Sequence, residues 1–232
     1  MSQIAFDAPP RPATHSPALW RVAGGLAIAH VVLLFAGFSQ ERSAVLGAGT
    51  TEARHALAEG SLARTLSGGY VEAFGCVLLL PVLAFLAQAV GTRTAVGRWA
   101  ASTSLVAGVA YVAITLAAGM PAGAAAVYGA HHGGDLATAV MVEDVRNFAF
   151  FLSLLVLGVQ ALALGIAARS DRFSPRWTGI GGVVVGILLL VGVAGAGLGL
   201  HDFASLLWTV WWVGVAIALI KNAPTSAVDA RS

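Results

Sequence analysis

A few charged or imidazole-bearing residues interrupt the long apolar stretches of this 232-residue sequence. Glu72 stands in the stretch YVEAFGCVLLLP, and the apolar run after it continues to Val90. The segment Asp144–Asn147 opens a later apolar stretch, and His201 and Asp202 open the last one. Ionisable groups inside apolar segments are costly and usually face a protein interior or a water-filled cavity. These residues are therefore candidates for proton transfer, for cation binding or for structural ion pairs.

Three of these polar positions lie at nearly the same distance from a basic residue at the far end of their stretch. The separations are 21 residues from Glu72 to Arg93, 22 from Asn147 to Arg169 and 19 from Asp202 to Lys221. A helix rises 1.5 Å per residue, so about 20 residues cross the roughly 30 Å of membrane hydrocarbon. The spacing predicts a polar layer at one edge of the hydrocarbon, and its members are Glu72, Asp144, Asn147, His201 and Asp202.

The elements that would position this layer are transmembrane helices. Hydrophobic residues make up 58% of the chain and charged residues only 10%, whereas about a quarter of a soluble domain is charged. The predicted spans are Leu19–Phe38, Leu66–Val90, Trp99–Met120, Ala139–Ala168, Trp177–Leu200 and Phe203–Ile220. The fold class is therefore all-α, a polytopic membrane protein with a bundle of six transmembrane helices in one domain, residues 18–221. The scattered basic residues give no nucleic-acid footprint.

The two ends of the chain are expected to be tails on the cytoplasmic side of a cell inner (plasma) membrane. Residues 1–17 are rich in proline and predict a disordered tail, and residues 222–232 form a second short tail. Arg/Trp pairs begin three spans, at Trp20–Arg21, Arg98–Trp99 and Arg176–Trp177, whereas the expected outer loop around Gly119–Thr138 has no Lys or Arg. By the positive-inside rule, both termini are cytoplasmic and the polar layer faces outward.

Two chemical interpretations of the polar layer stay open beside a structural one. Glu72 and Asp202 could act as a catalytic pair of carboxylates, with Glu72 as the acid, as in terpene-cyclase-like protonation of an alkene or epoxide. Alternatively, Glu72 could be the main carboxylate of a ligand pocket. Asp144, Arg146, Asn147, His201 and His30 would be its further ligand-binding residues. In the structural interpretation, Arg146 forms an ion pair, with Glu143 three residues away or across the bundle.

The histidines give weaker signals. The stretch HHGGD offers His131, His132 and Asp135, which are residue types that zinc accepts, but no established zinc-binding spacing is present. We therefore expect no metal and no cofactor. A single histidine inside a helix, such as His30, usually makes a hydrogen bond across a helix interface. Cys76, the single cysteine, is expected to be buried.

Glycines at helical spacing predict close helix packing in the fifth span. Gly182 and Gly186 form one G-x-x-x-G motif, and Gly195 and Gly199 form another. Such motifs let two helix backbones approach closely, either within one chain or in a homodimer. Packing within the chain is the favoured interpretation, and a homodimer through either pair stays open.

The stretch GVQALALGIAARSDRFSPRWTGIGGVVVG, residues 158–186, together with the acidic residue early in the second span, resembles a large bacterial family of six-span membrane proteins. That family is known only as a domain of unknown function. The resemblance covers about Leu19 to Ile220 and implies the fold and a membrane location, with acidic residues near Glu72 and Asp202. Family members often carry a histidine at the outer start of the fourth span, where this chain has Asp144–Asn147.

The sequence therefore predicts an integral membrane protein with an outward-facing polar pocket. The expected ligand is small, apolar and lipid-like, or cationic, and membrane lipids are the expected surroundings. The first alternative is the intramembrane enzyme with paired carboxylates. The second is an accessory or structural membrane protein without a ligand.

Overall fold

The computed structural model describes residues 16–40, 50–171 and 175–221 and contains only helices in these ranges. The elements, in chain order, are α1 (Pro17–Phe38), α2 (Thr50–Glu59), α3 (Leu62–Ala89), α4 (Ala95–Ile114), η1 (Thr115–Gly119), α5 (Met120–His131), α6 (Leu136–Ser170), α7 (Arg176–Ala194), η2 (Ala196–Leu198) and α8 (Leu200–Lys221). Six of the described helical segments are long and apolar enough to cross a membrane, which confirms the predicted fold class. The predicted tails at both ends of the chain lie outside the described residues, apart from Ser16 and Pro17.

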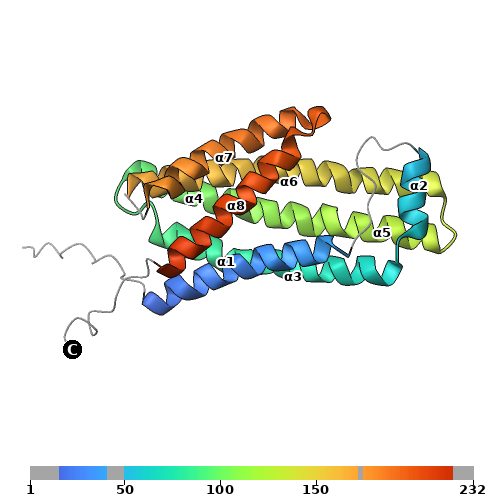
Figure 1. Ribbon diagram of the computed structural model, residues 1–232, viewed down its shortest axis with the longest axis horizontal. Coiled ribbons are helices and arrows are strands. Elements are labelled where there is room, and N and C mark those ends of the chain that lie inside the picture. Colours follow the sequence, from blue (N-terminus) through green and yellow to red (C-terminus); the bar gives the residue numbers. More distant parts are fainter. Residues whose placement is uncertain (1–15, 41–49, 172–174, 222–232) are drawn as a thin grey trace, which may run out of the picture.

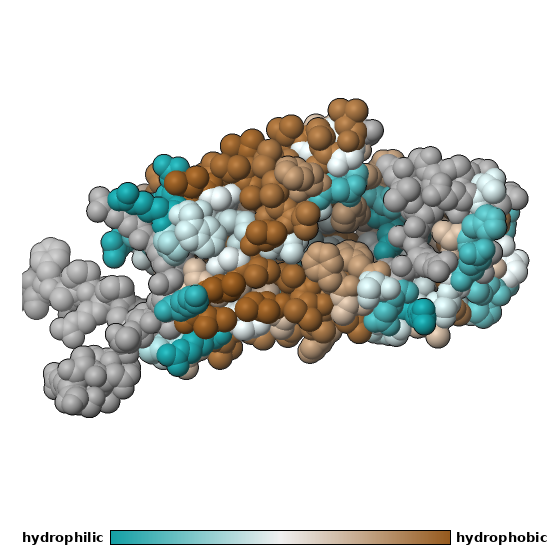
Figure 2. All heavy atoms as spheres, viewed as in Figure 1, coloured by the Kyte–Doolittle hydropathy of each residue, from teal (hydrophilic) through white to brown (hydrophobic). Residues whose placement is uncertain are grey.

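The described ends of the chain lie at one end of the bundle. Figure 1 shows α1 beginning and α8 ending at this end, which we call the terminal end, while α2 and the last turns of α5 lie at the opposite, distal end. In Figure 2, apolar residues cover much of the middle of the visible face, and hydrophilic residues gather toward both ends. This distribution is the one a bilayer requires, because side chains that face hydrocarbon must be apolar.

Two of the predicted spans are longer in the structure than the sequence indicated. The third runs from Ala95 through a π-helical turn, Thr115–Gly119, to His131, and the fourth runs from Leu136 to Ser170. The expectation of a loop around Gly119–Thr138 is therefore wrong, because most of that segment is α5. At 1.5 Å per residue, the 35 residues of α6 measure about 52 Å, well beyond the roughly 30 Å of hydrocarbon.

The extra length forms a small structure that we call the distal cap, which consists of α2, α5 and the first turns of α6. Leu57, Ala126, Val127 and Ala139 are buried together in its own hydrophobic cluster. Asp135 caps the start of α6 by accepting a hydrogen bond from the backbone N–H of Thr138. The cap was missed because α2 is polar and short, which gave no hydropathy signal.

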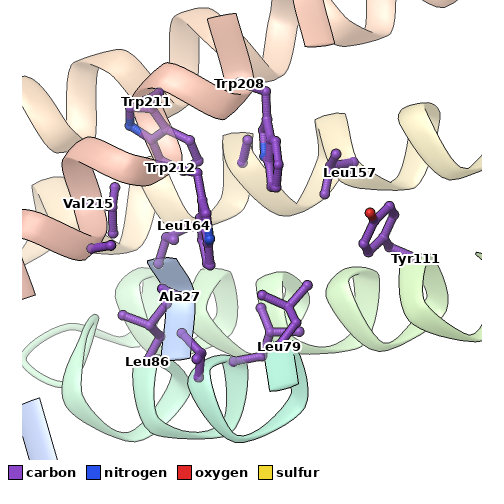
Figure 3. Packing of buried hydrophobic residues seen from close by; sticks show 14 of the residues in the cluster. Ala27, Leu79, Leu86, Tyr111, Leu157, Leu164, Trp208, Trp211, Trp212 and Val215 are labelled. Atoms are coloured by element: carbon purple, nitrogen blue, oxygen red, sulfur yellow. The ribbon is translucent and has the colours of Figure 1, made fainter. Parts of the chain in front are cut away.

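The main core lies among the membrane-spanning helices. Figure 3 shows Trp212 of α8 pointing toward Leu164 of α6 and Ala27 of α1, with Trp208 beside it. The indole of Trp211 is also buried and donates to the Thr178 carbonyl oxygen of α7. The rings of Trp208 and Trp212 stack with centroids 5.6 Å apart. The tryptophan cluster of the last span is therefore a packing element inside the bundle rather than part of an interfacial belt.

Close packing of α6 on α7 depends on glycine. A Cβ atom added to Gly182 would lie 2.9 Å from the Ala161 carbonyl oxygen, and one added to Gly186 would lie 2.6 Å from the Leu162 nitrogen. Both glycines therefore serve packing within the chain, the favoured interpretation. The second motif is different: α7 ends at Ala194, and Gly199 adopts φ +69° in the turn before α8. The prediction of a second helical glycine face at Gly195 and Gly199 is wrong, because the chain turns there.

Candidate functional site

Glu72 is buried in the interior, although it lies on an apolar transmembrane helix. Only 4% of the surface of Glu72 is exposed. Gly37 of α1 makes this position possible, because a Cβ atom there would lie 2.8 Å from Glu72 Cβ and 2.7 Å from the Gly68 carbonyl oxygen. The α1 backbone thus passes directly against the α3 turn that carries Glu72. The sequence expectation that Glu72 faces inward is supported by this burial.

Two further groups that can carry a proton lie beside Glu72. Cys76 is one helical turn along α3, four residues on, and is fully buried. The hydroxyl of Tyr111, on α4, lies within hydrogen-bonding distance of the Cys76 thiol. Both groups also interact electrostatically with the Glu72 carboxylate. A carboxyl, a thiol and a phenol from two helices therefore form one buried cluster.

His30 completes this cluster from α1. Its imidazole is fully buried, and Nδ1 donates a hydrogen bond of 2.9 Å to the Gly75 carbonyl oxygen, which can only accept. The ring meets Tyr111 and Trp208 edge to face, with centroids 6.4 Å apart in both pairs. The hydrogen bond across the α1–α3 interface agrees with the role expected for a single histidine inside a helix. We call His30, Glu72, Cys76 and Tyr111 the core cluster.

Arg146 forms its ion pair locally. Its guanidinium donates to Glu143 Oε1 over 3.2 Å, and both side chains are largely buried. The arginine stem lies across α5, where a Cβ atom on Gly123 would approach Arg146 Cδ within 2.6 Å. The ion pair lies within α6, and the stem of its arginine packs against α5 at Gly123. Glu143 is the acidic residue of this helix that turns inward, whereas Asp144 and Asn147 are only partly buried.

Asp202 does not join Glu72 in the interior. Its side chain is 78% exposed, and its carboxylate lies 3.3 Å from His201 Nε2. His201 packs edge to face against Phe151 of α6, with centroids 5.0 Å apart. Among the described residues, we find no contact between Asp202 and Glu72. The expected carboxylate pair is therefore not formed in this structure, because the first turn of α8 directs Asp202 outward.

The three residues considered for a metal each have another structural role. His131 Nε2 donates to the Gly60 carbonyl oxygen, and His132 donates to the Tyr128 carbonyl oxygen while its ring stacks on Tyr128. Asp135 caps α6. Across the described ranges, no group of three or more His, Cys, Asp or Glu residues is placed to hold a metal ion.

Sequence reasoning missed Tyr111 and Glu143 as interior groups and gave Cys76 only a packing role. The signal for Tyr111 was available, since it is the one tyrosine in the third predicted span. Glu143 could not be separated from Asp144 by sequence, because adjacent positions on a helix differ only in the direction they face. Ser104 and Gln160 form a further buried polar pair, joined by a hydrogen bond of 3.4 Å between α4 and α6.

Comparisons of the chain with protein-family models, with curated proteins and with solved structures gave no match. The resemblance to the six-span bacterial family therefore stays a prediction.

Proposed function

We propose that this protein is a multi-pass protein of the cell inner membrane that binds a small lipid-like or cationic ligand at the core cluster, with Glu72 as the main binding group. The burial of Glu72 on a membrane-spanning helix is the observation that supports this proposal most strongly. Burying a carboxylate inside a membrane costs free energy, and such carboxylates mark ligand, ion or proton sites more often than structural positions.

The surroundings of Glu72 favour a ligand that combines charge and apolar surface. The carboxylate can attract a cation, while the rings of Tyr111 and Trp208 line the interior nearby and can contact a cation through their faces or an alkyl chain through their surfaces. The ligand would enter from the distal end, where the ion pair of Glu143 and Arg146 lies. By the positive-inside rule, this end faces outward.

An intramembrane enzyme is the second candidate. The Tyr111 hydroxyl and the Glu72 carboxyl lie near each other in an apolar interior, and either can donate a proton to a bound substrate. The exposed position of Asp202 removes the support for a Glu72–Asp202 pair. Acid chemistry here would therefore use Tyr111 rather than Asp202 beside Glu72.

The ligand-binding proposal is tested by labelling Glu72 with dicyclohexylcarbodiimide, an apolar reagent that modifies carboxyl groups in apolar surroundings. We expect mass spectrometry of the purified protein in detergent to find the label on Glu72 and little on Asp202, which serves as the exposed reference. Dodecyltrimethylammonium should slow the labelling several-fold by occupying the site. The E72Q variant should lose the label.

Dodecanol, which has the same chain without the charge, separates the two ligand classes. A cationic site predicts protection by dodecyltrimethylammonium alone, and a lipid-like site predicts protection by both compounds. Labelling of Glu72 that neither compound slows would contradict the proposed function.

A further inference from the structure

Several polar atoms in the middle of the bundle have no hydrogen-bond partner among the described residues. They are His30 Nε2, Trp208 Nε1, Trp212 Nε1 and Gln160 Oε1, and all four residues are at least 97% buried. Buried polar atoms in proteins are nearly always hydrogen-bonded to protein or to bound water. Lipid tails cannot form hydrogen bonds, so such atoms in a membrane interior need a bound molecule as their hydrogen-bond partner.

The hydrogen-bonding roles of these atoms are complementary. Since Nδ1 of His30 donates to the Gly75 carbonyl, Nε2 of the neutral ring is an acceptor that faces away from α3. The indole N–H of Trp208 can only donate. A molecule that both donates and accepts, such as a hydroxyl group, satisfies both atoms at once.

The side chains of His30 and Trp208 are neighbours in the bundle core. The rings of His30 and Trp208 are perpendicular, at 87°, with centroids 6.4 Å apart. Two hydrogen bonds of about 2.9 Å that share one oxygen join nitrogen atoms up to about 5.5 Å apart. Polar atoms held too far apart for a direct bond are commonly bridged by water. Proteins hold on the order of one buried water for every 27 residues.

We propose that the bundle core has an internal water-binding site between His30 and Trp208, next to Tyr111. Its basis is the pair of complementary polar atoms, so it does not depend on the ligand-binding role of Glu72. His30 and Tyr111 also belong to the core cluster, and Tyr111 lies beside Cys76 and Glu72. Water at His30 would therefore extend a chain of hydrogen-bonding groups from Glu72 to the middle of the bundle.

Trp211 provides a matched control within the same helix. It is as deeply buried as Trp208, but its Nε1 donates to the Thr178 carbonyl oxygen over 2.9 Å. The crevice beside it is lined mainly by apolar residues, among them Leu86, Leu164 and Val215. Apolar spaces of this kind stay dry. Two tryptophans of similar burial are therefore expected to differ in hydration.

Synchrotron X-ray radiolysis tests the site, because it produces hydroxyl radicals from bound water and oxidises the side chains next to it. We expect mass spectrometry to find oxidation of Trp208 and Tyr111 at a rate at least five-fold above that of Trp211. In water enriched in 18O, the heavy isotope should appear in the Trp208 product. Oxidation of Trp208 no faster than that of Trp211 would overturn the proposal, as would a product without 18O.

The H30L variant tests the role of the imidazole. Removing Nε2 should lower the oxidation of Trp208 to the rate of Trp211, while W211F should leave the Trp208 rate unchanged. An unchanged Trp208 rate in folded H30L would exclude His30 as part of the site. If H30L does not fold, the comparison of Trp208 with Trp211 in the natural chain still decides the proposal.

Discussion

Asp171 shows, at the scale of single residues, how a buried carboxylate can be purely structural. It lies at the end of α6 and accepts hydrogen bonds from the backbone nitrogens of Thr92 and Arg93, over 2.7 and 2.9 Å, and from the Thr92 hydroxyl. These bonds hold the turn between α3 and α4 against α6. Glu72 lies instead inside a membrane-spanning helix, beside the Cys76 thiol and the Tyr111 hydroxyl, and we interpret it as a binding group.

The D171N variant is expected to lose stability. An asparagine side chain is uncharged and has one acceptor oxygen in place of two, so one of the two backbone N–H groups loses its acceptor, at a cost of about 1.5–3 kcal/mol. Thermal unfolding in detergent measures the effect. D202N is the matched control, because its side chain is largely exposed, and its stability should change by less than about 0.5 kcal/mol. Equal losses in the two variants would contradict the anchoring role of Asp171.

Substitution of Glu72 has a different expected result. In the E72Q variant, the amide keeps the volume of the side chain but cannot carry the negative charge that attracts a cation. Protection of the fold by dodecyltrimethylammonium, measured as the rise in unfolding temperature, should therefore disappear. Dodecanol carries no charge, so any effect it has on the unfolding temperature should be the same in both proteins. An E72Q protein that dodecyltrimethylammonium still stabilises fully would show that the cation binds elsewhere.

At the scale of helices, the close contact between α6 and α7 is expected to contribute to the stability of the bundle. A Cβ atom on Gly165 would lie 2.6 Å from the Val183 nitrogen and 2.8 Å from the Gly179 carbonyl oxygen, so neither backbone can accommodate it without moving. We expect G165A to destabilise the bundle by about 1–3 kcal/mol. Unfolding of the variant in detergent, followed by circular dichroism, provides the measurement.

Gly25 offers the control for this experiment. It lies inside α1 and is exposed, with nothing within 4 Å of an added Cβ atom. G25A should leave stability unchanged or raise it by about 0.5–1 kcal/mol, because alanine favours a helix more than glycine does. If G165A proved as stable as G25A, the close approach of α6 and α7 would be wrong.

The six spans could be predicted from the sequence because each contains an apolar run long enough to cross the membrane. The direction in which polar side chains face could not be predicted as well. Residues at one depth of neighbouring helices can face inward, as Glu72 does, or outward, as Asp202 does. That choice depends on helix rotation, which the packing of glycines such as Gly37 sets. Hydropathy averages over a helix and carries no information about its rotation.

The charges of the whole molecule predict its orientation. Six exposed basic residues lie toward the terminal end: Arg21, Arg93, Arg98, Arg169, Arg176 and Lys221. The described acid at this end, Asp171, is buried. A green fluorescent protein fused to the C-terminus should fluoresce, and alkaline phosphatase fused there should be inactive, since the positive-inside rule places this end in the cytoplasm.

A fusion in the distal turn at Gly134 is the internal control and should give the opposite pattern, with active phosphatase. Active phosphatase at the C-terminus would reverse the orientation. The proposed site would then be entered from the cytoplasm.

The length of α6 also determines how this protein can be imaged. With a mass of 23.5 kDa and six helices long and apolar enough to cross a membrane, the chain offers little contrast for electron microscopy. The distal cap projects beyond the hydrocarbon, and α6 joins it to the membrane core without a break. An antibody fragment bound to the cap would therefore be held rigidly to the bundle, and would supply the alignment mark that an experimental map requires.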